Sequence, residues 1–172
     1  MRTNISLILL LAALFSPSAR AQGDAAAYLK ALLDKGRVTA VCNYTVEGGT
    51  PVSGYGTAVL EGNCFRLDSG NLQVFCDGNA IYTVDTGAKE VYIEKADSAG
   101  SFLKDPKDLL ESIQDLKYNA TSLSGSIPDP QNESTLHFVL SDIKKEGPSG
   151  NRDEFRFNPS SVGPDWVVTD LR

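Results

Sequence analysis

The residue types that could perform acid–base or nucleophilic chemistry are few, and they are not spaced as a catalytic set. His137 is the single histidine of the chain, and it lies in an alternating apolar stretch that predicts a β-strand. A general base or metal ligand needs polar partners nearby, and the surrounding sequence offers none. The serine-rich stretches at 53–56 and 122–126 lack the G-x-S-x-G nucleophile pattern and are typical of turns. We therefore expect no enzymatic activity, no metal site and no cofactor.

The chain has three cysteines, Cys42, Cys64 and Cys76, so they cannot all pair with one another. No C-x-x-C motif is present, which argues against a redox or zinc site. Cys42 lies in a strand-like stretch and is interpreted as a small buried residue rather than a reactive thiol.

Whether Cys64 and Cys76 form a disulfide depends on the register of the two strands that meet at the turn over 69–71. If Asp68 faces Leu72, the two cysteines lie opposite each other, close enough for a bridge. If Ser69 faces Leu72, the cysteines fall on opposite faces. The second register places four apolar side chains on one face, namely Phe65, Leu67, Val74 and Cys76. Their burial favours this register.

The stretch from Gly62 to Glu94 predicts an antiparallel meander. Its reversals contain Gly-Asn, Ser-Gly-Asn, Asp-Gly-Asn and Asp-Thr-Gly, which supply the positive φ and the side-chain hydrogen bonds of tight turns. We expect Asp68, Asp77 and Asp85 to bond the backbone in these turns. The strands between them are expected at 64–69, 72–76, 80–84 and 90–94.

Further strands are expected on both sides of the meander. Val38 to Val46 alternates between apolar and polar residues, and a second strand is expected at about 54–61. After the meander, strands are expected at 116–124, 134–143, 153–157 and 166–171. Consecutive strands without intervening helices favour an antiparallel sheet over a βαβ fold.

Two short helices are expected outside the sheet. Asp24 can cap a helix over 25–35, and Asp105-Pro106 can begin a second one. Three apolar residues of this second segment would form a lid or plug across one mouth of the sheet: Leu109, Leu110 and Ile113. The predicted fold class is mainly β (α+β), a curved antiparallel sheet that forms an incomplete β-barrel covered by short helices.

The first 21 residues have the pattern of a secretory signal peptide. Arg2 precedes an apolar run over 5–15, and Ala19-Arg20-Ala21 matches a small-x-small cleavage site. Cleavage after Ala21 would leave one domain over 22–172 and would lower the net charge from −6 to −8, because two arginines are lost. No cysteine follows at a lipidation position, and no basic stripe indicates nucleic-acid binding. We expect an exported, soluble monomer.

A half-open sheet under short helices can enclose an apolar cavity. The alternative is that the same side chains fill a core, and strand alternation does not separate a filled interior from a hollow one. Alternation selects nine residues as the cavity lining: Tyr44, Phe65, Leu67, Val74, Tyr82, Val91, Ile93, Leu136 and Phe138.

Several short motifs occur in an order that is typical of one family. Gly62-Asn63-Cys64-Phe65-Arg66-Leu67, Asp77-Gly78 with Tyr82, and Glu90-Val91-Tyr92-Ile93 resemble the G-x-x-F-x-L, D-G-x-x-x-W/Y and E-V pattern of LolA-like outer-membrane lipoprotein carriers. Asp105-Pro106 with Leu109-Leu110 is similar to that family's Asn-Pro-x-x-Leu segment. The ending, Phe155-Arg156-Phe157-Asn158 followed by Trp166 to Arg172, resembles the Bacteroidetes-type branch of the family.

This resemblance implies an incomplete β-barrel with a helical lid. It also implies a periplasmic carrier that shields lipoprotein acyl chains in an apolar cavity and delivers them towards the outer membrane. The implied partners are acylated lipoproteins, an inner-membrane release machinery and an outer-membrane acceptor. A periplasmic module of the same fold that senses lipid or lipoprotein is the alternative. An exported hydrolase would need His137 or a serine for activity.

Overall fold

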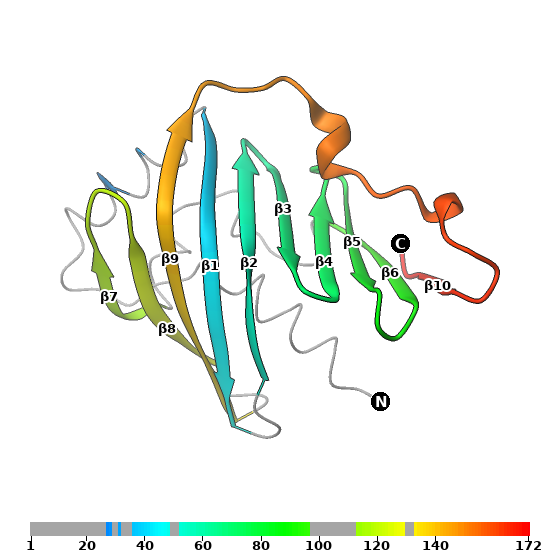
Figure 1. Cartoon of the computed structure of the whole chain (residues 1–172), viewed down its shortest axis with the longest axis horizontal. Coiled ribbons are helices and arrows are strands. Elements are labelled where there is room, and N and C mark those ends of the chain that lie inside the picture. Colours follow the sequence, from blue (N-terminus) through cyan, green and yellow to red (C-terminus); the bar gives the residue numbers. More distant parts are fainter. Residues whose placement is uncertain (1–26, 29–30, 32–35, 49–51, 97–112, 130–132) are drawn as a thin grey trace.

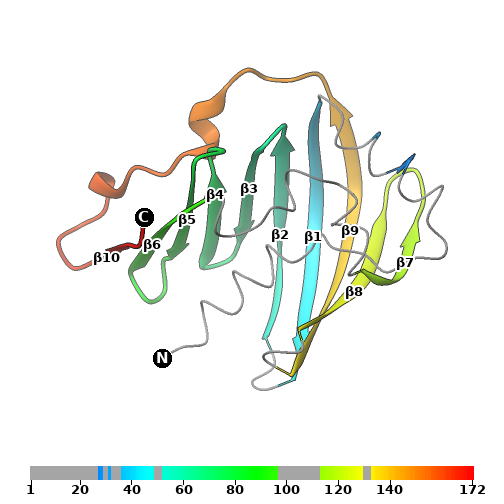
Figure 2. The ribbon, with the colours of Figure 1, turned by 180° about the vertical axis from the view of Figure 1, so that it is seen from behind.

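The computed structural model describes residues 27–28, 31, 36–48, 52–96, 113–129 and 133–172. Ten strands form one mixed sheet in the order β10-β6-β5-β4-β3-β2-β1-β9-β8-β7 (Figures 1 and 2). In the described chain, β10 and β7 are its two edges, so the sheet is not closed into a barrel. The strands are β1 (Arg37–Glu47), β2 (Val52–Glu61), β3 (Cys64–Ser69), β4 (Leu72–Cys76), β5 (Ala80–Asp85), β6 (Glu90–Lys95), β7 (Gln114–Tyr118), β8 (Leu123–Asp129), β9 (Ser134–Glu146) and β10 (Val167–Asp170).

The meander predicted from the turn residues is confirmed. Strands β2 to β6 pair antiparallel with their neighbours in chain order. The β2–β3 and β3–β4 turns have two residues each, Gly62-Asn63 and Gly70-Asn71, whose glycines have φ of +62° and +58°. A glycine with positive φ at the first turn position is the requirement of a type II′ hairpin.

Aspartates close the next two turns. The Asp77 carboxylate accepts hydrogen bonds from the backbone N–H groups of Asn79 and Ala80, at 2.9 and 2.8 Å. Asp85 accepts two more in the β5–β6 turn, both at 2.9 Å. The prediction for Asp68 was wrong, because this residue lies inside β3 and pairs with Arg66.

The sequence directly before β9 forms a hairpin, not the single strand expected at 116–124. Strands β7 and β8 pair antiparallel, and the chain reverses where the Asn119 N–H bonds the Ser122 carbonyl at 2.9 Å. The Asn119 side chain stabilises the turn by accepting from the Thr121 N–H at 2.9 Å. Apolar residues lie on both sides of this polar turn, so the sequence pattern does not mark the reversal.

The C-terminal part differs more from the prediction. The strand expected at 153–157 is replaced by a 3₁₀ helix, η2 (Arg152–Phe155), and a second one, η3 (Pro159–Ser161), follows. Figure 1 shows this segment, in orange, passing from the end of β9 across the neighbouring strand ends. It leads to β10, which pairs with β6 in parallel. The prediction of a wholly antiparallel sheet is therefore wrong at this edge.

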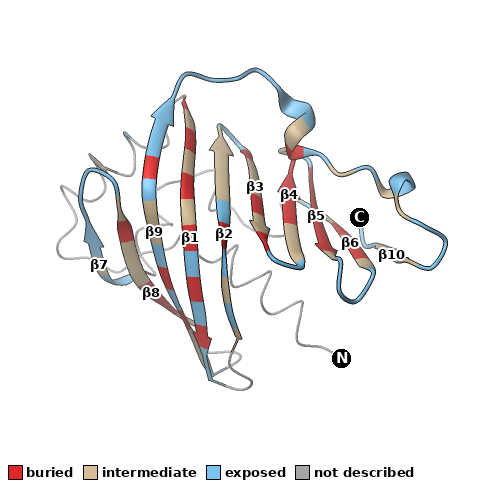
Figure 3. Cartoon of the chain, in the orientation of Figure 1, coloured by how far each residue is buried: buried red, intermediate tan, exposed pale blue. Residues whose placement is uncertain are grey.

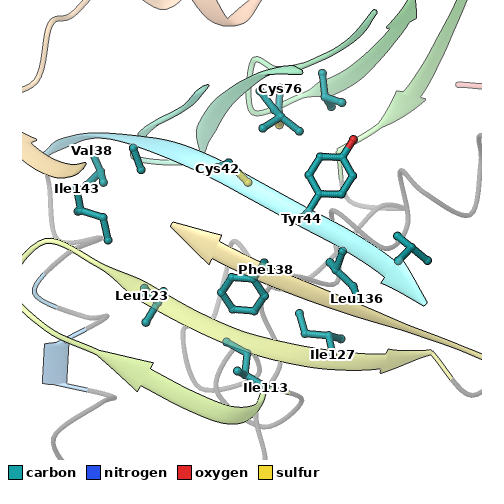
Figure 4. Close-up of a cluster of buried hydrophobic side chains, with 14 of the residues drawn as sticks. Val38, Cys42, Tyr44, Cys76, Ile113, Leu123, Ile127, Leu136, Phe138 and Ile143 are labelled. Atoms are coloured by element: carbon teal, nitrogen blue, oxygen red, sulfur yellow. The ribbon is translucent and has the colours of Figure 1, made fainter. Parts of the chain in front are cut away.

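The two faces of the sheet differ in composition. We call the face that carries Tyr44 and Phe138 the inner face, and the opposite one the outer face. In β1, every second residue is buried (Figure 3). Fifteen buried residues form the inner cluster, most of which Figure 4 shows: Val38, Ala40, Cys42, Tyr44, Val46, Leu67, Val74, Cys76, Ile81, Ile113, Leu123, Ile127, Leu136, Phe138 and Ile143.

Among the described residues, the outer face carries an apolar cluster where the C-terminal segment covers it. Six buried residues of β4, β5 and β6 form the outer cluster: Phe75, Ala80, Tyr82, Val84, Val91 and Ile93. Phe157, Val162 and Trp166 of the C-terminal segment pack on this cluster. The outer face of β1, by contrast, carries exposed Asn43 and Thr45.

The predicted helices fall mostly outside the described residues. Of the helix expected at 25–35, Ala27, Tyr28 and Ala31 are described and are helical. Leu109 and Leu110, predicted as part of a lid, lie outside the described residues. No helix in the described part of the chain has the length and apolar character needed to cross a membrane.

Glycines allow close approach on the inner face. Gly54 lies opposite Tyr44 in the β1–β2 ladder, and a Cβ at this position would be 2.3 Å from the Tyr44 ring. The ring therefore occupies the space that a side chain at position 54 would need. Gly56 is buried, and a Cβ there would be 1.8 Å from the carbonyl oxygen of Asp68. At Gly56 the obstacle is backbone, which cannot rotate away.

We predict that Gly56→Ala destabilises the protein by about 1–3 kcal/mol, because the methyl group forces the end of β3 to move. Urea unfolding of the purified protein measures the effect. Gly147→Ala is the control: a Cβ added at Gly147 would have no atom within 4 Å, so its midpoint should match that of the natural protein. Equal midpoints for both variants would show that the close approach at Gly56 is absent.

Candidate functional site

Six of the nine predicted lining residues lie together on the inner face. They come from β1, β3, β4 and β9, and five are fully buried members of the inner cluster, while Phe65 is half-buried and packs against it. Tyr44 lies directly opposite Phe138 in the β1–β9 ladder, so the two side chains share a face; Figure 4 shows both among the side chains of the inner cluster, together with Leu136. The six are Tyr44, Phe65, Leu67, Val74, Leu136 and Phe138.

The other three predicted lining residues, Tyr82, Val91 and Ile93, are on the outer face. Tyr82 lies opposite Phe75 in one ladder and opposite Ile93 in the next, and residues that are directly opposite share a face. They belong to the outer cluster and cannot line a cavity under the inner face. The reason is the β4–β5 turn, which places Ile81 directly opposite Cys76. Ile81 therefore points to the inner face, and its neighbours Ala80 and Tyr82 point to the outer face.

Sequence reasoning missed the contribution of β8 to the inner face. Leu123 and Ile127 are each 2% exposed and lie in the inner cluster. The alternation of Leu123, Gly125 and Ile127 was the available signal, but the single strand expected at 116–124 ended before Gly125 and Ile127. Ile113, predicted as part of the lid, is buried against Gly125, where an added Cβ would lie 2.4 Å from the Ile113 side chain.

The inner face changes character at β5 and β6. Thr83 lies opposite Val74 on one side and Tyr92 on the other, so all three side chains share the inner face. The Tyr92 hydroxyl donates a hydrogen bond of 2.9 Å to Glu90, which raises the pKa of Tyr92. We call the apolar part of the inner face, from β5 to β7 in the order of the sheet, the apolar floor. It ends at Thr83, next to a polar margin formed by Tyr92 and Glu90 of β6.

Two buried hydroxyl groups have no hydrogen-bond partner within the described residues, Thr83 Oγ1 and the Tyr28 hydroxyl. Tyr28 packs against the inner cluster and stacks on Tyr118, with ring centroids 5.0 Å apart. Burial raises the pKa of Tyr28. Buried polar groups are nearly always bonded in folded proteins, so an unpartnered one marks a strained or functional position.

All three cysteines are free thiols and are buried. Ser69 faces Leu72 and Phe65 faces Cys76, which is the register that the burial of the apolar residues favoured. Cys64 and Cys76 consequently lie on opposite faces, and no disulfide joins them. Burial raises the pKa of both Cys42 and Cys76 to about 11.

Two hollows open elsewhere on the surface. One, of about 510 Å³, is lined largely by outer-face residues of β1, β2 and β9, including Tyr55 and His137. His137 Nε2 is 3.4 Å from a carboxylate oxygen of Glu47, and both side chains are substantially exposed. The second, of about 410 Å³, lies between Tyr82, Arg156 and Arg172. No cluster of potential metal ligands occurs among the residues that the structure describes.

The apolar inner face with its polar margin is the candidate site. No family model and no curated protein sequence matches this chain. The functional inference therefore depends on the arrangement of the described residues and on the order of the sequence motifs.

The two-face arrangement predicts an energetic coupling between Phe75 and Phe157, whose ring centroids are 5.7 Å apart. A double-mutant cycle with both residues changed to leucine should give a coupling of about 0.5–1.5 kcal/mol, the usual worth of an aromatic pair. Denaturant unfolding of the four proteins measures it.

The control is the same cycle with Phe138 in place of Phe75. Phe138 and Phe157 pack in different clusters, so their effects should add within about 0.5 kcal/mol. A coupling of similar size in both cycles would contradict the separation of the two faces.

The buried thiols should react slowly in the folded protein. A raised thiol pKa lowers the fraction of reactive thiolate at neutral pH, and burial also blocks access. We expect little alkylation by iodoacetamide at neutral pH in the native state and three adducts after unfolding in guanidinium chloride, measured by intact mass. A mass two hydrogens lighter before reduction would reveal a disulfide and contradict the observed register.

Proposed function

We propose that this protein is a periplasmic carrier that shields the acyl chains of lipoproteins on its inner face and delivers them towards the outer membrane. The observation that supports this most directly is the continuity of the apolar inner face. Residues that belong to it or pack on it come from every strand between β5 and β7. The buried members of the inner cluster are at most 8% exposed.

The dimensions of the face suit this cargo. Adjacent strands are about 4.8 Å apart, so the eight strands from β5 to β7 give an apolar path of about 34 Å. The hydrocarbon core of a bilayer is about 30 Å thick and holds two layers of acyl chains. The inner face is therefore wide enough for more than one chain.

The energetic demand also fits. Each CH₂ group removed from water contributes about 0.8 kcal/mol, so a free acyl chain strongly resists transport through an aqueous compartment. The outer cluster provides a separate core on β4 to β6, covered by side chains of the C-terminal segment. Because the outer cluster stabilises the fold, the inner face would be able to bind and release acyl chains without unfolding of the sheet.

The proposal includes the finer features that the sequence resemblance implies. The sheet would act as an incomplete barrel, with the helix at 25–35 and the segment carrying Leu109 and Leu110 as its lid. The 1–21 segment would direct export. The protein would work as a monomer between an inner-membrane release machinery and an outer-membrane acceptor.

We predict that a photoreactive benzoylphenylalanine in place of Phe138 captures acylated cargo. The residue lies in the inner cluster, so irradiation of cells of the source organism should produce adducts that carry acyl chains. Mass spectrometry of the protein purified from the periplasm identifies them.

The same substitution at Val139 is a matched control. Val139 follows Phe138 directly in β9 but is 45% exposed, and it lines the outer hollow. It should give no acyl adduct. Repeated absence of acyl adducts at Phe138, or equal yields at both positions, would refute the carrier proposal.

A further inference from the structure

Thr83 places a hydroxyl group without a hydrogen-bond partner among the described residues of the inner face. It is 2% exposed in the middle of β5, and its Oγ1 has no hydrogen-bond partner within the described residues. Valine has the same shape as threonine and favours strands equally well. At a site that needed only packing, valine would avoid the cost of a buried, unsatisfied hydroxyl.

The neighbours of Thr83 do not use its hydroxyl. Val74, directly opposite in β4, is apolar and 3% exposed. Tyr92, opposite in β6, directs its own hydroxyl to Glu90. The Thr83 hydroxyl thus lies between an apolar floor and a polar margin, where the polar linkage of an amphiphile would lie if its chain followed the floor.

We propose that the Thr83 hydroxyl donates a hydrogen bond to the ester or amide carbonyl of a bound acyl amphiphile. This inference rests on the proposed carrier function and adds to it a residue that determines specificity. The polar margin also limits the cargo. Glu90 and Glu94 share the inner face with Tyr92 by strand alternation, so an uncharged linkage is accommodated better than an anionic headgroup.

The test uses two lipids that differ in one group. 1-Monolauroylglycerol has an ester carbonyl, and 1-O-dodecylglycerol has an ether at the same place. Calorimetric titration of the full-length mature protein should show about five- to tenfold tighter binding of the ester, the effect of one neutral hydrogen bond. Thr83→Val should bind both lipids equally, and Thr83→Ser should restore the preference.

Thr57→Val is the control, because Thr57 is exposed in β2 and its hydroxyl should not affect the preference for the ester.

Without lipid, Thr83→Val should unfold at a higher temperature than the natural protein, because it removes an unsatisfied buried group. A preference that survives in Thr83→Val would overturn the inference and leave the carrier function intact. A lower unfolding temperature for Thr83→Val would also overturn it, since the hydroxyl would then have a partner. Failure of the natural protein to bind either lipid would count against both proposals.

Discussion

The register of the central strands determines nearly everything else in this molecule. Two turns of two residues, each with a glycine at positive φ, lock β2 to β3 and β3 to β4. Because side chains alternate between faces, a shift of one residue between β3 and β4 would put Leu67 and Val74 on different faces and bring Cys64 opposite Cys76. The turn over 69–71 thus decides at once the composition of the inner face and the redox state of the thiols.

The C-terminal segment gives the sheet its second core and is itself held by polar contacts. Arg37, at the start of β1, forms ion pairs with Glu61 and Glu154 and is 17% exposed. Glu61 also accepts hydrogen bonds from Ser149, which lower the pKa of Glu61. These contacts fix the path from β9 to η2, where Phe155 is buried to 1% exposure. The segment can then lay Phe157 and Trp166 on the outer cluster.

Local signals in the sequence were sufficient for the meander and for six of the nine residues assigned to the inner face. They failed where the structure depends on contacts between distant segments. Tyr82, Val91 and Ile93 were assigned to the wrong face because the β4–β5 turn determines which residues of β5 point to the inner face. The sequence of a turn with several residues does not show how it pairs the two strands. The parallel pairing of β10 and the 3₁₀ helix at Phe155 depend on the outer core, which alternation within a single strand does not indicate.

The proposed carrier role needs affinity and release together, and the two kinds of contact on the inner face would divide these tasks. An apolar floor binds any chain in proportion to the area it buries, and about fifteen CH₂ groups at about 0.8 kcal/mol each would contribute about 12 kcal/mol before the costs of ordering. Further apolar area would slow release without improving selection. A single directional hydrogen bond adds little affinity but discriminates between linkages. A threonine at the end of the floor, bordered by the Tyr92–Glu90 pair, would therefore be suited to selecting cargo without trapping it.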